Sequence, residues 1–574
     1  MPPRRSLKQH DATAESHTRK MRRQRALDQV RKDKRHSAVQ TKRRRPVSTA
    51  RPVPRSGRSL SALVECLRGG GDDNSASGVL PIEARVEALR EIRLVLAGAQ
   101  ETREDEFEEI EQLIALGIVP ILVALLDSAA PLHSASRLAE EVYREVLWCL
   151  TNIASGSYEH TKLVVPAVPR LVELLESSSQ LLAGHAAWTL GNIAADCNEF
   201  RQHLIANGVV VPLVQRLGTF GETEAAAEVA KTSAWALSNL ARGFETRAKP
   251  FVDAGIIPVV VQGLARPRAG ALFSDDIVVE VAWLLSFLTA REEECLRLML
   301  DAGLVDVLLP YFSTTDHVLL TPILRVFGNV CCGSADHHTD AWQLPYVRRL
   351  VSAESVAFVP KLCEFLQQTG TQQTALAVEA AWVISNLAAT EVAIVDRLMQ
   401  AQVLPLLGQQ FKEGGYDVRR EVAFALTNIA LTSAAHLDDV LALDVVKGFL
   451  HLLTVADIAV VGNSLRFIEN VLRVAPRGAL LVETNEGIDA LETVQFECGD
   501  ERLSQWAAAL VNEFYGENYG IHSPPSAGAE FTEFGGSSGE PMMQLSFDTS
   551  QQSPASGTAG RGRGAHMTTP AWKK

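Results

Sequence analysis

The sequence predicts an all-α solenoid of stacked helical repeats, and both its composition and its internal repetition indicate this fold. The chain has 574 residues, of which 47% are hydrophobic and only 6% are aromatic. This length exceeds what one ordinary hydrophobic core supports, so several domains or a repeat array are expected. An abundance of Ala, Leu and Val favours helices over β-sandwiches. Two phrases recur along the chain, and they favour the repeat array.

The first phrase is a small residue, a glycine, two or three apolar residues and, in most copies, a proline. It occurs as Leu116–Pro120, Asn207–Pro212 and Ala254–Pro258, and Asp301–Val305 opens in the same way but lacks the proline. Glycine commonly ends a helix, and proline is tolerated in the first turn of the next one. The phrase therefore predicts a junction between two short helices.

The second phrase is an aromatic residue followed four residues later by asparagine, within a longer predicted helix. Successive Asn positions are separated by 40, 47, 48, 42, 57, 42 and 42 residues, mostly close to the roughly 40–47 of armadillo and HEAT units. We therefore expect a right-handed superhelical armadillo-repeat solenoid with about three helices per unit. We call the marked positions the Trp–Asn ladder: Trp148/Asn152, Trp188/Asn192, Trp235/Asn239, Trp283/Phe287, Arg325/Asn329, Trp382/Asn386, Phe424/Asn428 and Asn470.

Composition and spacing also predict the domain boundaries. The 57-residue interval predicts an insertion at about Ser334–Val351, and unmarked units are expected to cap the array at Ile82–Gly98 and Ser504–Phe514. Pro and Gly cluster after the basic N-terminal segment, and Gly, Ser, Pro and Thr dominate from about residue 520. The expected order is a flexible basic arm over 1–58, a linker over 59–78, about ten armadillo units over 79–518 and a disordered tail over 519–574.

Charge is distributed unevenly along the chain. Residues 1–58 hold 19 Lys and Arg against 4 Asp and Glu, a net charge of +15. The remaining residues hold 36 basic and 64 acidic side chains, a net charge of −28. A basic arm tethered to an acidic body can fold back onto that body or bind an acidic partner.

Several features argue for a soluble intracellular protein. The eight cysteines show no paired spacing that would build a disulfide or zinc framework, so a reducing compartment is expected. The N-terminus has no apolar signal segment, and no apolar run reaches the roughly 18 residues of a membrane span. The cluster Asp336–His338 invites comparison with a metal site, but a polar loop in the insertion is the better interpretation, and no cofactor is expected.

The chemistry of the Trp–Asn ladder indicates peptide binding. Residues four apart lie on the same helix face, so the ladder predicts a row of parallel indoles with an amide beside each. Indole faces attract cations and pack against the methylenes of Lys or Arg. An Asn amide offers a donor and an acceptor to the backbone of an extended peptide. The alternative is that each Trp is simply part of the core, but packing alone does not explain a repeated polar amide.

Carboxylates near the ladder are candidates for pairing with a ligand's lysines. Asp196 lies four residues after Asn192, at a predicted helix end. A partly desolvated carboxylate gives a stronger bond to an ammonium group than a surface pair does. For any single Glu the alternative is a solvated helix residue. The other candidates each precede their ladder aromatic by three residues: Glu145, Glu280, Glu379 and Glu421.

At this point the sequence resembles the importin alpha family over residues 14–515. The segments Leu150–Gly156, Trp188–Asp196 and Ser233–Gly243 match that family's second, third and fourth repeats almost word for word. The resemblance implies an adaptor that carries cargo proteins with basic nuclear localisation signals. It also implies a major groove built on Trp148, Asn152, Trp188, Asn192, Trp235, Asn239 and Glu280, with Gly156, Thr161 and Asp196 capturing the deepest lysine.

The family interrupts its ladder in the middle, and Phe287 and Arg325 do the same in this chain. The resemblance then implies a second, minor groove on the later units. Phe424 departs from the family, which usually has Trp there, and Phe binds cations more weakly. The minor groove is expected to involve Arg325, Asn329, Glu379, Trp382, Asn386, Glu421 and Asn428.

The N-terminal arm resembles the family's importin-beta-binding segment. Arg19–Arg25 and Arg31–Arg35 would form a basic helix, and Lys42–Arg45 resembles an internal signal mimic that competes with cargo. By family analogy the last units would dock an export receptor of the CAS type with Ran-GTP, and the protein would shuttle between cytoplasm and nucleus. The arm residues concerned are Arg22, Arg23, Arg25, Arg31, Lys32, Lys42, Arg43, Arg44 and Arg45.

Other functions are less consistent with the sequence. An armadillo scaffold unrelated to transport would lack the repeated amides and the basic arm. A nucleic-acid binder would need a body that does not repel phosphates, whereas this body is acidic. An enzyme is not expected, because the chain has no phosphate-binding Gly–Lys loop, zinc-protease pair or nucleophile elbow.

Overall fold

The computed structural model describes residues 57–68, 81–97, 110–128, 137–219, 221, 223–242, 245–266, 275–332, 342–352, 357–367 and 371–516. Throughout these residues the regular structure is helical, as predicted. The predicted basic arm, apart from residues 57 and 58, and the predicted tail lie outside the described residues.

One long helix per unit carries the Trp–Asn ladder or the equivalent position at an end of the array, and we call these the inner helices. Each inner helix packs against the next one along the chain. They are α3 (Ile82–Leu96), α6 (Arg137–Ala154), α9 (Gln180–Asp196), α12 (Glu224–Ala241), α15 (Asp275–Thr289), α18 (His317–Cys331), α21 (Thr371–Leu387), α24 (Tyr416–Ala430), α27 (Ile458–Val474) and α30 (Glu501–Tyr515).

Shorter helices alternate with the inner helices. From Tyr158 to Tyr515 two short α-helices precede each inner helix, which confirms the predicted unit of about three helices. The short helices are α2 (Leu60–Arg68), α5 (Ile118–Ser128), α7 (Tyr158–Val164), α8 (Val168–Leu175), α10 (Asn198–Ala206), α11 (Val210–Gly218), α13 (Lys249–Asp253), α14 (Ile256–Leu264), α16 (Glu293–Asp301), α17 (Leu304–Leu308), α19 (Leu344–Val351), α20 (Phe358–Gln367), α22 (Val392–Gln400), α23 (Val403–Glu413), α25 (Ala434–Leu441), α26 (Val446–Leu452), α28 (Gly478–Thr484) and α29 (Gly487–Glu497).

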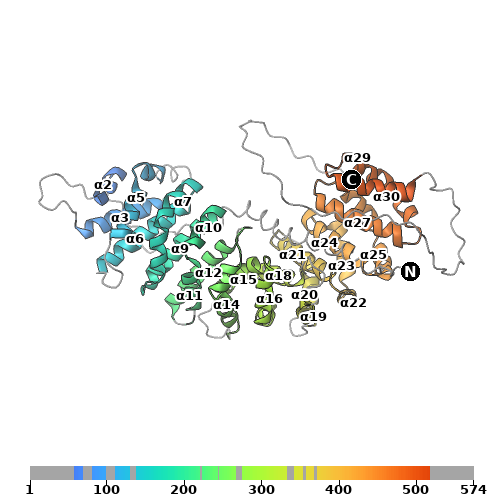
Figure 1. Ribbon diagram of the computed structural model, residues 1–574, viewed down its shortest axis with the longest axis horizontal. Helices are drawn as coiled ribbons and strands as arrows, with labels where there is room; N and C mark the ends of the chain where they lie inside the picture. Colours follow the sequence, from blue (N-terminus) through green and yellow to red (C-terminus); the bar gives the residue numbers. More distant parts are fainter. Residues whose placement is uncertain are drawn as a thin grey trace, which may run out of the picture.

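The units stack into an arched solenoid. Figure 1 shows the inner helices α9 to α24 along the upper, concave side of the arch and helices such as α11, α14, α16 and α20 along the lower, convex side. Because each unit meets only its neighbours, the core is one continuous layer of apolar side chains between the two rows of helices. This arrangement places the helices that carry the Trp–Asn ladder on the concave side.

The glycine junctions form as predicted. Gly117, Gly208, Gly255 and Gly303 all adopt positive φ angles, between 74° and 89°, which residues with a Cβ rarely adopt. Gly117, Gly255 and Gly303 immediately precede the short helices α5, α14 and α17. One residue separates Gly208 from the start of α11. The backbone reverses at these glycines, and this lets successive short helices pack side by side on the convex side.

The predicted linker over 59–78 is partly wrong, because residues 60–68 form helix α2. Leu63, Val64 and Leu67 are buried, and α2 packs against α3 and α5. Their spacing is that of one apolar helix face. Arg58 joins this end of the solenoid through an ion pair of 2.5 Å with Glu91. The array therefore begins before the predicted boundary.

The predicted insertion at Ser334–Val351 is also helical in part. Residues 344–351 form α19, which contacts α18, α20 and α22. Val347 and Leu350 on α19 are buried. α19 is thus the first helix of an ordinary unit, and residues 333–341 lie outside the described part of the chain.

Six ladder asparagines each connect their own inner helix to the preceding one. In each case the side-chain Nδ2 donates to a backbone carbonyl oxygen of the preceding inner helix, at 2.8–3.2 Å. We call these the interrepeat amide bonds. The donor–acceptor pairs are Asn192–Thr151, Asn239–Gly191, Asn329–Ser286, Asn386–Gly328, Asn428–Ser385 and Asn470–Ala430.

Arginines make further bonds between units. Arg216 on α11 donates to the carbonyl oxygens of Leu175 and Ser177, at and just beyond the end of α8. Arg291, just after α15, donates to the carbonyl oxygens of Ala241 and Thr246 near the end of α12. Both satisfy carbonyls that a helix end leaves without an intrahelical partner.

An interrepeat amide bond should contribute measurably to stability. Asn386→Ala removes the donor to the buried Gly328 carbonyl, so we expect a loss of about 1–3 kcal/mol in urea unfolding followed by circular dichroism. Asn207→Ala is the matched control, because the exposed Asn207 amide bonds the carbonyl oxygen and the ring of His203 within its own unit. Equal losses in the two variants would contradict a special role for the bond between units.

Candidate peptide-binding groove

The ladder indoles differ in their exposure. Trp148, Trp188, Trp283 and Trp382 are half-buried, whereas Trp235 is only 3% exposed. The two ladder phenylalanines, Phe287 and Phe424, are also buried, at 5% and 2%. Four ladder indoles are therefore partly exposed, whereas Trp235, Phe287 and Phe424 are buried.

The predicted parallel arrangement of the indoles is wrong where neighbouring indoles meet. Trp188 and Trp235 have ring centroids 6.5 Å apart and planes inclined at 69°, an edge-to-face pair. Edge-to-face contact is favoured because the positive ring edge meets the negative ring face. Trp148 is likewise tilted, by 44°, against the buried His185 of α9. Electrostatic preference between rings, which spacing does not reveal, sets these angles.

Glycines provide the space in which two indoles lie. A Cβ built on Gly191 would stand 2.4 Å from Cζ3 of Trp235, and one on Gly328 would stand 2.0 Å from Cζ3 of Trp382. Both glycines immediately precede a ladder Asn and also accept an interrepeat amide bond. Only glycine at these positions lets the indole of the next unit lie directly on the helix.

A side chain at Gly328 should displace Trp382. We expect Gly328→Ala to destabilise the protein by about 1–3 kcal/mol despite the better helix propensity of Ala, because the indole must move. Thermal unfolding and near-ultraviolet circular dichroism would measure both effects. Gly462→Ala is the control, since its Cβ would meet Leu503 at an ordinary 3.5 Å. An unchanged indole signal in Gly328→Ala would refute this packing.

The ladder amides are buried rather than presented at the surface. Asn152, Asn192, Asn239 and Asn386 are at most 1% exposed. The side-chain nitrogens of Asn192, Asn239 and Asn386 donate interrepeat amide bonds. The ladder asparagines therefore contribute to packing between units, a role that the sequence analysis had set aside. The Oδ1 atoms of Asn239 and Asn386 are buried and have no hydrogen-bond partner within the described structure.

Three of the carboxylates predicted to face a ligand are already paired with arginines of the chain. Glu379 lies 2.7 Å from Arg325, and Glu421 lies 2.7 Å from Arg420, its neighbour on α24. Glu145 is 1% exposed and pairs with Arg93 and Arg144, both at 2.9 Å. Glu280 is 7% exposed. Burying these carboxylates would be costly without such partners.

The three residues expected to capture a lysine lie at the same end of neighbouring helices. Trp148 meets His185, and Thr151 bonds both Thr189 and Asn192, so α6 and α9 run side by side in the same direction. Asp196 is the last residue of α9 and half-buried. Gly156 follows the end of α6, and Thr161 lies on α7, which contacts α9.

Gly156 and Thr161 shape the turn after α6. A Cβ on Gly156 would stand 2.4 Å from Nδ1 of His160, so no larger residue fits without moving that ring. The buried Thr161 hydroxyl lies 3.2 Å from the Ala154 carbonyl oxygen and 3.0 Å from that of Ser157. Thr161 therefore stabilises the turn, and the half-exposed Gly156 and Asp196 are left as the surface beside it.

The carboxyl end of α9 is a site of negative potential. The helix dipole and the Asp196 carboxylate both favour a cation there. Arg201 already uses this potential, because its Nη1 donates to the Ala194 carbonyl oxygen at 3.1 Å. Burial lowers the pKa of Arg201, and the nearby acidic groups, including Asp196, oppose this effect. The acidic groups near the end of α9 therefore offset only part of the cost of burying a cation there.

Sequence analysis missed the chain's own cations on the ladder rings. The guanidinium of Arg93 lies 4.2 Å from the Trp148 ring centroid, that of Arg325 5.0 Å from Trp283, and that of Arg242 5.6 Å from Phe287. Arg325 was predicted to replace a ladder Trp, but its contact with Trp283 was not. These contacts reach across units, so no local spacing indicates them.

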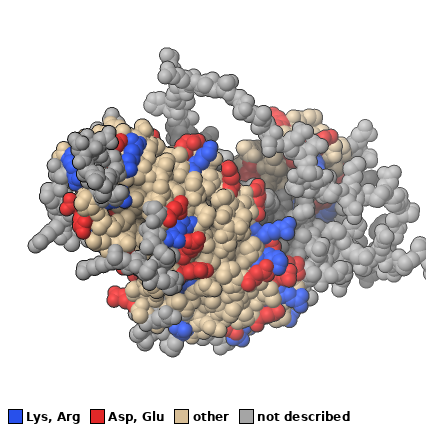
Figure 2. All heavy atoms as spheres, turned by 60° about the vertical axis from the view of Figure 1, so that its left-hand side comes forward, with Lys and Arg blue, Asp and Glu red and all other residues tan. Residues whose placement is uncertain are grey.

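The surface over the first repeats combines uncharged and acidic areas. Figure 2 shows groups of acidic side chains, some beside basic ones, bordering a broad uncharged area. The predicted arm residues, Arg22 to Arg45, lie outside the described residues, so the structure does not test their contacts.

Comparisons with known proteins agree with this architecture. A HEAT-like repeat family matches residues 141–193. Importin subunit alpha-9 of Arabidopsis thaliana is 31% identical over 457 residues, 77% of this chain and 81% of that protein. Importin subunit alpha-2 of Oryza sativa subsp. japonica is 27% identical over 454 residues, 76% of this chain and 79% of that protein. The crystal structure of an engineered protein superimposes with a TM-score of 0.61 at 25% identity, over 79% of this chain and 98% of that one.

The stacked units of about three helices define an armadillo-repeat solenoid. The length and level of identity to the plant proteins are specific, and the chain belongs to the importin alpha family. This membership supports a role in nuclear import.

Metal sites and membrane spans were also considered for the described residues. These residues contain no group of three or more His, Cys, Asp or Glu side chains placed to hold a metal ion. None of the described helices combines the length and the apolar character of a membrane span.

Proposed function

We propose that this chain is a nuclear import adaptor that binds Lys/Arg-rich localisation signals of cargo proteins along the Trp–Asn ladder and links them to importin beta. The supporting observation is the row of half-buried indoles, Trp148, Trp188, Trp283 and Trp382, on inner helices of a chain in the importin alpha family. Indole faces attract cations and pack against long methylene chains. Such an adaptor acts by binding alone and needs no cofactor or catalytic residue.

The major groove of this proposal runs over α6, α9 and α12. One lysine of the signal places its ammonium group at the carboxyl end of α9, beside Asp196 and Gly156, where the helix dipole adds to the carboxylate. The indole of Trp188 holds a neighbouring cationic side chain of the signal. The buried Asn239 side chain supports this surface from below, because its bond to the Gly191 carbonyl oxygen fixes α12 against α9.

Reversal of the charge at Asp196 tests the lysine site. We expect Asp196→Lys to weaken binding of a fluorescent Lys-rich signal peptide by about a hundredfold or more, because two cations would meet at a desolvated site. Fluorescence anisotropy measures the affinity, and circular dichroism should show unchanged helical content, since Asp196 ends its helix. Asp438→Lys, an exposed change on α25, is the control. Equal affinities for the two variants would exclude Asp196 from the site.

The arm is proposed to regulate the groove. Its net charge of +15 over residues 1–58 stands beside −28 over the remaining residues, so the arm and body attract each other. The cluster Lys42–Arg45 competes with cargo, and the tether gives it an effective concentration on the order of millimolar. Importin beta binds the basic segments that include Arg22, Arg23, Arg25, Arg31 and Lys32, which withdraws the arm and frees the groove.

Removal of the arm should therefore tighten peptide binding. Deletion of residues 1–56 keeps Arg58, which pairs with Glu91 and stabilises the first helices. We expect this variant to bind the Lys-rich peptide at least several-fold more tightly in the same titration, because the tethered competitor is gone. Replacement of Lys42, Arg43, Arg44 and Arg45 by Ala in the full chain should reproduce the gain. Unchanged affinity in both variants would rule out competition by the arm.

A minor groove is proposed on the later inner helices. Trp382, held over Gly328, is its half-buried indole. Phe424 is 2% exposed, and Glu379 and Glu421 are paired with arginines, so fewer groups remain for a ligand than in the major groove. We propose Arg325, Asn329, Asn386 and Asn428 as its further residues. The last units are proposed to dock an export receptor of the CAS type with Ran-GTP, which returns the adaptor from nucleus to cytoplasm.

A further inference from the structure

The first indole of the ladder already carries a cation. The Arg93 guanidinium, from α3, lies over Trp148 at 4.2 Å from the ring centroid, within the range of a cation–π contact. The Arg93 side chain is 14% exposed. It approaches from the side of α3, while His185 approaches the same indole from α9 on the other side. Arg93 therefore occupies the place at this end of the ladder where a ligand cation would lie.

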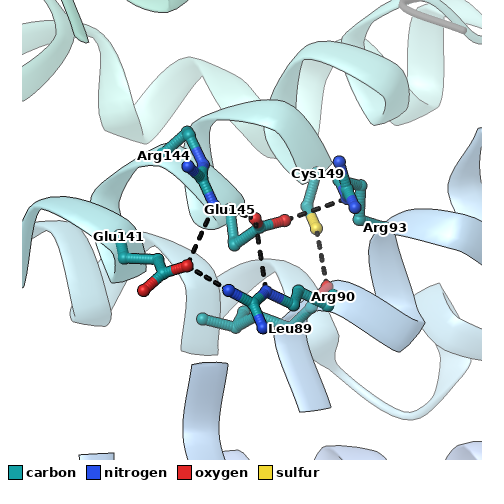
Figure 3. Close-up of polar contacts among 7 residues, drawn as sticks. All are labelled: Leu89, Arg90, Arg93, Glu141, Arg144, Glu145 and Cys149. Carbon is teal, nitrogen blue, oxygen red and sulfur yellow. Dashed lines mark hydrogen bonds and ion pairs between the residues drawn. The ribbon is translucent and has the colours of Figure 1, made fainter. Parts of the chain in front are cut away.

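Arg93 is held in this position by a buried charge network. Figure 3 shows Glu145 directed at Arg93 and Arg90, with Arg144 and Glu141 beside them. Glu145 binds Arg93 and Arg144 at 2.9 Å each and lies 3.9 Å from Arg90. Arg90 and Arg144 also pair with Glu141. Since Glu145 is only 1% exposed, releasing Arg93 would remove one partner from a buried carboxylate.

The network carries an excess of positive charge. Three guanidinium groups pair with two carboxylates. A further cation at this end of the ladder would therefore find the α3 side of the indole covered and both network carboxylates already paired. A ligand lysine there would be repelled by Arg93 at short range. An uncharged or acidic side chain would meet no such repulsion.

Arg325 makes a related contact in the middle of the ladder. It lies 5.0 Å from the ring centroid of Trp283 and pairs with Glu379 of the next inner helix at 2.7 Å. Trp148 and Trp283 are thus each covered by an arginine from the neighbouring inner helix, α3 and α18 respectively. The ladder segment from Trp148 to Trp283 lies between these two arginines.

We propose that Arg93 ends the major groove at Trp148 and makes the ligand position beside it select against Lys and Arg. This inference rests on the proposed function, since it concerns the same groove, and it adds a rule for the signal. Cationic side chains of the peptide bind between Arg93 and Arg325, and the peptide position beside Arg93 is uncharged or acidic. The chain's own guanidinium thereby fixes the register of a bound basic peptide.

The test measures binding of the full chain to a set of Lys-rich signal peptides. In this set, each position that flanks the basic cluster is in turn Lys, Ala or Glu. In the wild-type protein, Lys at one flanking position should weaken binding by about tenfold relative to Ala. Arg93→Leu keeps the apolar stem and should reduce this difference to about twofold or less. Arg93→Lys keeps a cation in place and should preserve the discrimination. Circular dichroism checks that each variant is folded.

Arg90→Leu is the matched control, because it removes one positive charge from the same helix and network but leaves the guanidinium on Trp148 in place. It should discriminate as the wild type does. If Arg93→Leu discriminates like the wild type, or if Arg90→Leu loses discrimination equally, Arg93 is not the selecting group. If the unmodified peptide binds neither wild type nor variants, the proposed function itself fails and this inference fails with it.

Discussion

The interrepeat amide bond is the interaction on which the concave surface depends. A solenoid has few contacts between distant residues, so the relative placement of neighbouring helices must be fixed at each joint separately. A hydrogen bond from a buried Asn to a backbone carbonyl does this, because a small shift of one helix would leave both groups desolvated and unpaired. The bond sets the offset between inner helices and hence the spacing of the indoles.

The glycines beneath Trp235 and Trp382 connect this bond to the groove. Gly191 and Gly328 each accept an interrepeat amide bond through their carbonyl oxygens and leave room for the indole of the following unit. Tryptophan, asparagine and glycine thus act together at one place in each of these joints. Stability and the proposed ligand recognition therefore draw on the same residues, so a substitution at one of them should change both.

Much of the fold and part of the site could be predicted from the sequence. The repeat spacing, the glycine junctions and the ladder positions on long helices follow from local patterns and are confirmed. Helix α2 was missed because its short apolar face lies between segments rich in Pro, Gly and Asp. The tilt of the indoles, the burial of the amides and the pairing of Glu145 with Arg93 depend on contacts between units, which spacing within one unit does not contain.

The bonds of Arg216 and Arg291 to carbonyls of the preceding unit have a mechanical consequence. Together with the amide bonds they form a series of short polar links, each joining one unit to its neighbour. A pulling force along the axis passes through every joint in turn, because each unit contacts only its neighbours. The resistance of the solenoid to stretching is therefore set by its weakest joint, and additional units lengthen the molecule without strengthening it.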